Sequence, residues 1–202
     1  MRRANARISA ESKPESENVI GLFRRTESAA RELSGELRDD QSSNMRRRRA
    51  VIGLSSLGSA SLGLIGLYQT GIIKHLPEPP LPYLNAEKVD ASPEAYEWLS
   101  TPDAVLGIGN FGATMILAAM GGTDRVTKQP FIPIALAGKA ALDVFNAARL
   151  TRDQWTKHRA FCIWCLLAAG ATFATVPFVV PEAVEAVRNL RFGRPKLIIK
   201  AA

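Results

Sequence analysis

Apolar residues gather in four blocks that charged or proline-rich stretches separate. Three blocks contain no charged residue, and the third in order carries only Lys139 and Asp143. The blocks comprise residues 50–73, 104–123, 131–148 and 160–180. A helix needs about 20 predominantly apolar residues to cross a bilayer, within a range of about 17–25. The pattern therefore predicts an all-α integral membrane protein, a four-transmembrane-helix bundle with an external loop segment between helices 1 and 2.

A soluble helical bundle with unusually apolar helices is the competing interpretation. The chain has 202 residues, 47% of them hydrophobic, so it is long enough to bury one sizeable core. However, soluble helices normally keep a polar face, and the three charge-free blocks have none. The membrane bundle, with the lipid bilayer as its first partner, is therefore favoured.

Charge is distributed unevenly between the two ends and the first long connection. Residues 1–49 hold 12 Arg/Lys against 8 Asp/Glu, and residues 188–200 hold 5 against none. Residues 74–103 hold 2 against 6. Because positive residues flank the cytoplasmic ends of spans, we expect both termini in the cytoplasm and the first loop outside. The connection at 149–159, with four basic residues and one acidic, disagrees, but the two basic termini outweigh it.

The predicted organisation is a membrane domain between two polar tails. Residues 1–49 form a basic, flexible cytoplasmic tail, residues 50–180 the membrane domain, and residues 181–202 a basic cytoplasmic tail. The net charge of +7 and the arginine run 46–49 could indicate a soluble nucleic-acid binder. Since the run ends where the first apolar block begins, we expect no nucleic-acid partner. Within the first tail, residues 19–37 favour either an amphipathic helix on the membrane surface or a solvated or disordered segment.

The two cysteines of the chain, Cys162 and Cys165, open the fourth apolar block as a C-x-x-C motif. Their i,i+3 spacing places both sulfurs on one helical face, close enough to bridge. The positive end of the helix dipole and the basic residues at 157–159 favour the thiolate. The motif is therefore a candidate redox pair, near the outer (periplasmic or lumenal) face of the membrane.

Two other interpretations of the pair remain open. A metal site would need two more donors, and the chain offers only His75 and His158, so no metal is expected. Inert packing residues would need no particular spacing.

Lys139 and Asp143 are the only charged residues inside a predicted span. Their i,i+4 spacing lets them pair on one face. An intramembrane pair of this kind either serves function or locks the third span against its neighbours.

The helix order and three short passages resemble the vitamin K epoxide reductase family, in the form of a bacterial-type homologue that lacks the loop cysteines. The passages are Phe161–Cys165, Lys88–Ser92 and Leu99–Gly107, the last two being similar to the family's entry into its second helix. The resemblance covers about residues 50–180. It implies a membrane quinone-linked thiol/disulfide oxidoreductase.

By this resemblance, Cys165 faces a quinone of the ubiquinone or menaquinone type, and Cys162 takes part in thiol exchange. A supporting catalytic hydroxyl corresponds to Ser100 or Thr101. The expected cofactor contacts are Cys165, Trp164 and Asn110.

The chain also departs from the family pattern. Ala91 stands where the family has a loop cysteine, and Ala169 stands where some relatives carry a quinone-contacting tyrosine. An internal relay between two cysteine pairs is therefore impossible. Either an external thiol/disulfide protein or small thiol reaches Cys162, or the chain is a non-catalytic four-helix membrane scaffold or partner-binding subunit.

Overall fold

The computed structural model of this chain describes residues 15–193, with side chains from residue 27 onward. The chain divides into two units, Met1–Asp40 and Gln41–Ala202. The described part of the first unit is one helix, α1 (Glu15–Asp39), within the segment predicted as a polar tail. Residues 1–14 and 194–202 of the two predicted tails lie outside the described residues.

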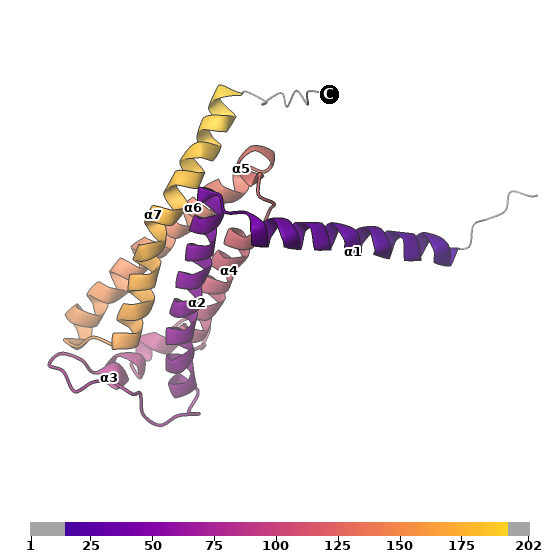
Figure 1. The fold of residues 1–202 in the computed structure, drawn as a ribbon. Coiled ribbons are helices and arrows are strands. Elements are labelled where there is room, and N and C mark those ends of the chain that lie inside the picture. The colour runs from indigo at the N-terminus through magenta and orange to yellow at the C-terminus, as the bar shows by residue number, and fades with distance from the viewer. Residues whose placement is uncertain (1–14, 194–202) are drawn as a thin grey trace, which may run out of the picture. The chain divides into compact units, whose positions relative to one another are not determined.

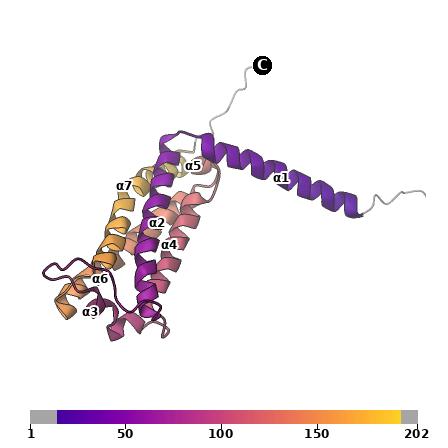
Figure 2. The same ribbon diagram turned by 60° about the horizontal axis from the view of Figure 1, so that its bottom comes forward.

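Four helices form the bundle of the second unit. They are α2 (Ser43–Gln69), α4 (Asp103–Ala119), α6 (Phe131–Asp153) and α7 (Ile163–Phe192). Helix α2 packs against both α4 and α7, and α6 packs against α7 and touches α4. The two views in Figures 1 and 2 show the four helices side by side, with the short helix α3 (Ala86–Asp90) at one end of the bundle and the short helix α5 (Arg125–Lys128) at the other. The all-α prediction is confirmed.

Three of these helices are long and apolar enough to cross a membrane. They are α2, α7 and α6 continued by its π-helical turn η2 (Gln154–His158). Helix α4 is apolar but has only 17 residues, which gives it a length of about 25 Å at about 1.5 Å per residue. The prediction of a membrane protein is supported by these lengths, while the count of four spans stays a prediction.

The helix ends differ from the apolar blocks that predicted them. Helix α2 begins at Ser43 because the Ser42 hydroxyl accepts the N–H of Met45 at 3.2 Å and caps its first turn. The arginine run, placed in the predicted tail, is therefore helical and forms the first turns of α2. Helix α7 continues beyond residue 180, with Pro181 inside it, and ends at Phe192. Residues 181–192, predicted as tail, thus belong to the bundle helix.

Two glycines lie at the contact between α2 and α4. A Cβ at Gly58 would clash with the ring of Phe111, and one at Gly107 would clash with the end of the Leu62 side chain. The lack of a side chain at Gly58 therefore leaves room for the Phe111 ring where the two helices pack on each other.

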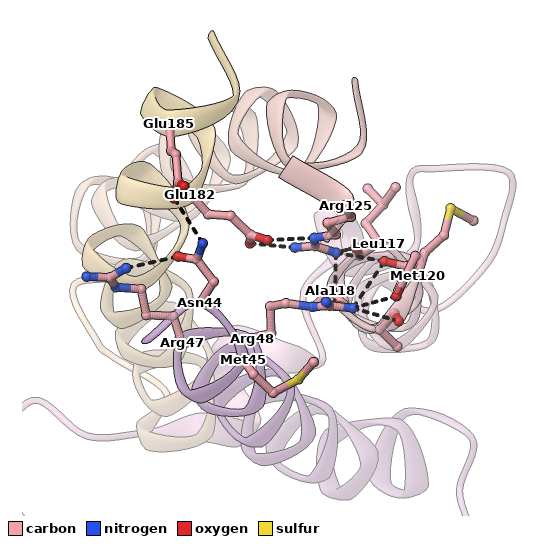
Figure 3. Close-up of polar contacts among 12 residues, drawn as sticks. Asn44, Met45, Arg47, Arg48, Leu117, Ala118, Met120, Arg125, Glu182 and Glu185 are labelled. Carbon is pink, nitrogen blue, oxygen red and sulfur yellow. Dashed lines mark hydrogen bonds and ion pairs between the residues drawn. The ribbon is translucent and has the colours of Figure 1, made fainter. Parts of the chain in front are cut away.

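At the α5 end of the bundle, two buried arginines cap the last turn of α4. The side chain of Arg48 on α2 donates to the carbonyls of residues 118–122 at 2.8–3.2 Å. Arg125 on α5 donates to three carbonyls in the same turn and forms a two-pronged ion pair with Glu182 of α7 at 2.6 and 2.7 Å. Figure 3 shows both guanidinium groups beside the end of α4. Since a helix leaves its last carbonyls unpaired, these cations complete the helix and hold three others to it.

Candidate functional site

The two cysteines lie together at the start of α7, at the α3 end of the bundle. Cys162 is the N-cap residue, and its Sγ accepts the backbone N–H of Cys165 at 3.2 Å. Both cysteines are free thiols. Cys162 is completely buried, whereas Cys165 is partly exposed. The C-x-x-C spacing thus brings the pair together as the sequence predicted, with one thiol capping the helix that carries the other.

A carboxylate from a distant segment completes the cluster. Asp90, the last residue of α3, is only 2% exposed. The thiol of Cys165 donates to Asp90 Oδ1 at 3.4 Å. One ligand atom from each of Asp90, Cys162 and Cys165 lies within 4.8 Å of the other two. The second carboxylate oxygen, Oδ2, is buried and has no hydrogen-bond partner among the described residues.

The surroundings of Asp90 disfavour its negative charge. The pKa of Asp90 is raised to about 6; burial is the largest cause, the neighbouring thiols of Cys162 and Cys165 lower the pKa, and the nearby acids Asp103 and Glu78 raise it. A carboxylate that is buried beside other acids lacks a compensating positive charge. At neutral pH the negative charge of Asp90 is therefore unfavourable in this site.

Gln69, at the end of α2, fixes Asp90 in place. Its Nε2 donates to the Asp90 carbonyl at 3.2 Å and to Asp103 Oδ1 at 2.7 Å. Its own backbone carbonyl accepts the Tyr96 hydroxyl at 3.2 Å. The end of α3 is thereby tied to the ends of α2 and α4.

Residues 74–98, here called the covering segment, lie over the cysteines. Its side chains Leu76, Ala86 and Val89 join Cys162 in one buried apolar cluster. Glu78 ties the segment down, because one of its oxygens accepts the N–H of Ile163 at 3.1 Å and the other accepts the N–H of Ala86 at 2.6 Å. A single carboxylate therefore caps the first turns of both α7 and α3.

A short backbone bridge joins the covering segment to the residue before the pair. Phe161 donates its N–H to the carbonyl of Tyr83 at 2.7 Å and accepts the N–H of Asn85 at 3.0 Å. The rings of Tyr83 and Phe161 both pack on Trp155, at centroid distances of 5.7 and 5.6 Å. Tyr83 also has a φ of 68°, in the left-handed region that costs non-glycine residues energy. These contacts hold the segment closed over Cys162.

Neither of the two predicted catalytic hydroxyls forms a hydrogen bond with the cysteine thiols in the described part of the chain. Ser100 is exposed, with a φ of 51°, and the hydroxyl of Thr101 donates to the Leu99 carbonyl at 3.1 Å. Between residues 27 and 193, no hydrogen bond joins either hydroxyl to Cys162 or Cys165. Their catalytic roles stay predictions.

Trp164 lies beside the pair and is anchored to the covering segment, since its Nε1 donates to the Pro77 carbonyl at 2.9 Å. It also packs on the apolar cluster that contains Cys162. The expected contact of this ring with a quinone stays a prediction.

Asn110 takes part in a polar network between α4 and α6. Its Nδ2 donates to Asp143 Oδ1 at 3.1 Å, and Lys139 donates to Asp143 Oδ2 at 2.6 Å and to the Thr114 hydroxyl at 2.7 Å. The predicted Lys139–Asp143 pair thus exists, and it connects two helices as the locking interpretation requires. The proposed contact of Asn110 with a cofactor stays a prediction.

Sequence reasoning missed three polar residues around the pair. Asp90 contacts a thiol, Glu78 caps the helix that carries the thiols, and Gln154 accepts the N–H of Cys162 at 3.1 Å. The passage around Asp90 was recognised only as part of a family resemblance. The one available signal was the excess of acidic residues in the first connection, which is not specific to any of them.

The comparison with protein families gives one result. The model of the Vitamin K epoxide reductase family matches residues 49–180. This range includes α4 and α6, α2 from residue 49, α7 up to residue 180, the covering segment and both cysteines. The comparisons with curated proteins and with solved structures gave no match.

Proposed function

Since the chain belongs to the vitamin K epoxide reductase family, we propose that it is a membrane-bound thiol oxidoreductase linked to a quinone. One observation carries the proposal: two free thiols lie together at the entrance of an apolar helix long enough to span the bilayer. Such a pair can pass two electrons by closing and reopening a disulfide. In the proposed arrangement the pair has the bilayer on one side and water on the other.

The proposed arrangement in the membrane has four spans, with α4 as the shortest. Helices α2, α4, α6 and α7 then run alternately across the bilayer, and both ends of the bundle domain lie in the cytoplasm. The covering segment and the cysteine pair consequently face the outer side. Disulfide chemistry is permitted in that compartment.

The proposed exchange step balances within thiol chemistry. A thiolate of an external dithiol attacks one sulfur of the Cys162–Cys165 disulfide, and the other sulfur leaves as a thiolate that takes up a proton. The second thiol of the partner then attacks the mixed disulfide. The partner leaves as a disulfide, and the pair is left as two thiols. The reverse sequence oxidises the pair and reduces the partner.

The residues beside Cys165 fit the head group of a quinone. Cys165 packs against the apolar cluster of the α3 end, to which Ile65, Leu62 and Tyr68 of α2 and Trp164 also belong. An apolar ring would find there apolar side chains beside a thiol, with the Asp90 carboxylate as the polar group that contacts this thiol. When bound, a quinone supplies the acceptor for two electrons and two protons.

Access to the pair depends on the covering segment. Cys162 is the thiol expected to exchange, yet it is the completely buried one of the two. An external thiol can attack it only after the contacts of Glu78 and Phe161 have opened. Opening of this segment is therefore a required step of the proposed exchange.

The same burial favours a second candidate function, a membrane scaffold or partner-binding subunit that has kept the fold without turnover. Ala91 stands at the position of the family's loop cysteine, so no second thiol pair within the chain can relay electrons. In that case the two thiols would stay reduced whatever the quinone.

Reconstitution tests the proposal directly. The protein is reduced, placed in lipid nanodiscs with or without an oxidised quinone, quenched with acid and alkylated for thiol counting. We expect the quinone to remove both alkylatable thiols of the wild-type chain. The Cys162→Ser and Cys165→Ser variants should each keep their single thiol. If both thiols of the wild-type chain stay fully alkylatable with ubiquinone and with menaquinone, the oxidoreductase proposal is wrong. The scaffold or partner-binding subunit is then the remaining candidate.

A further inference from the structure

We propose that, in their reduced state, Cys162 and Cys165 together with Asp90 form a binding site for a thiophilic divalent cation, with Zn²⁺ as the best-fitting ion. This inference goes beyond the proposed redox function. It requires neither a quinone nor an external thiol partner.

The geometry of the three residues suits a metal ion. Their ligand atoms lie within 4.8 Å of one another. In the sequence, helices α4, α5 and α6 separate Asp90 from Cys162. Bond lengths of about 2.3 Å to sulfur and about 2.0–2.2 Å to oxygen place tetrahedral ligands about 3.5–3.8 Å apart. Side-chain movements of about 1 Å or less therefore close the site around an ion.

An unpartnered oxygen points independently to a ligand. Asp90 Oδ2 is buried without a hydrogen-bond partner in the described part of the chain, and the residue is only 2% exposed. A buried carboxylate oxygen normally has a donor or a cation beside it. The two acids that raise its pKa, Asp103 and Glu78, add negative charge nearby. A divalent cation would offset this negative charge and occupy the unpartnered oxygen.

The donor set selects the class of metal. Two thiolates and one carboxylate favour Zn²⁺ over Mg²⁺ or Ca²⁺, which prefer oxygen ligands. Three protein ligands leave the fourth tetrahedral position for water. Glu78, which lies close to the pair, already accepts two backbone N–H groups and is occupied.

Metal binding and disulfide formation exclude each other at this site. Binding releases the two thiol protons and leaves both sulfurs as thiolate ligands, without any change of oxidation state. A Cys162–Cys165 disulfide has no thiolate to offer. The site therefore exists only in the dithiol form, and a bound cation protects the pair from oxidation.

Cobalt titration of the full-length, metal-stripped protein tests the site. The protein is reduced and kept without oxygen in detergent, with no quinone, and Co²⁺ is added as the spectroscopic probe. We expect one Co²⁺ per chain, with thiolate-to-cobalt charge-transfer bands and the visible bands of tetrahedral cobalt. Zn²⁺ should displace it, and the oxidised protein should give no such spectrum.

Two variants separate a specific site from general attraction to acidic residues. Asp90→Asn keeps the shape of the side chain and should weaken Zn²⁺ binding at least about 100-fold, because even outer partners of metal ligands contribute about 10–100-fold. Asp103→Asn, the matched control, removes a neighbouring acid outside the ligand set and should change the affinity less than about threefold. Helical circular dichroism confirms that both variants are folded.

Three results of the titration would contradict the proposed metal site. Equal affinity in the wild type and in Asp90→Asn, a spectrum without thiolate bands, or no binding at one equivalent would each overturn the metal site. None of these results bears on quinone-dependent thiol loss, so failure of the metal site is distinguishable from failure of the redox function.

Discussion

The two ends of the bundle both bury charged side chains, but they treat them in opposite ways. At the α5 end, Arg125 and Glu182 meet in a two-pronged ion pair, and each nitrogen of the Arg125 guanidinium donates a hydrogen bond. At the α3 end, Asp90 has one oxygen on a thiol and the other without a partner among the described residues. A buried charge with all its hydrogen bonds made stabilises a fold, whereas a buried carboxylate oxygen without a partner is typical of a functional site.

The largest effect is expected when one charge of the Arg125–Glu182 ion pair is removed. Glu182→Gln leaves the completely buried Arg125 without its counter-charge, so the free energy of unfolding should fall by about 3–5 kcal/mol. Unfolding in detergent, followed by helical circular dichroism, measures the loss.

Asn44→Ala is the matched control at the same end. It deletes two hydrogen bonds near the surface, one donated to Glu185 and one accepted from Arg47, and should cost only about 1 kcal/mol. Equal losses in the two variants would show that the buried pair does not stabilise the bundle.

A second change tests the hold of the covering segment. Glu78→Gln replaces one of two carboxylate oxygens with a donor that faces a backbone N–H, so one of its two contacts is lost. Loss of about 1.4 kcal/mol corresponds to a tenfold change in an equilibrium. The rate at which a small maleimide labels Cys162 should therefore rise about tenfold.

These labelling rates are measured in the Cys165→Ser background, so that only one thiol reacts. Glu97→Gln, an exposed acid in the same segment, serves as the control and should leave the rate unchanged. If Glu78→Gln labels no faster than the control, the segment does not guard the thiol.

The smallest expected effect is a gain in the free energy of unfolding, whereas Glu182→Gln lowers it. Asp90→Asn removes a buried charge without a counter-ion and keeps an oxygen for the Cys165 thiol, so the reduced, metal-free protein should gain about 1 kcal/mol in unfolding free energy. The measurement is the same unfolding experiment with a chelator present. A loss of stability instead would mean that the carboxylate has a stabilising partner, and the contrast between the two ends would fail.

Much of the bundle followed from the sequence, because lipid-spanning helices need long charge-free blocks. Helix α7 and most of α2 were predicted in this way. Their ends were not, since local capping decides them: Ser42 starts α2 ahead of the arginines, and α7 continues through Pro181. Arg48 belongs to the segment predicted as a basic, flexible tail, yet five backbone carbonyls accept hydrogen bonds from its buried side chain.

The site was predictable only where its residues are neighbours in the chain. The spacing of Cys162 and Cys165 places them together on one turn, and the structure agrees. Asp90 reaches the same turn from a five-residue helix in the connection after α2, and no local pattern encodes that contact. Only the folding of the covering segment onto α7 brings the carboxylate to the thiols.

The redox state of the pair in native membranes tests the central claim most directly. The tryptic peptide of residues 160–188 contains both cysteines and no internal Lys or Arg, so differential alkylation and mass spectrometry can quantify its dithiol and disulfide forms. If the chain is a quinone-linked thiol oxidoreductase, the disulfide fraction should change markedly when the cells are depleted of quinone and return when quinone is restored. A peptide that stays entirely in the dithiol form under all three conditions would contradict the account.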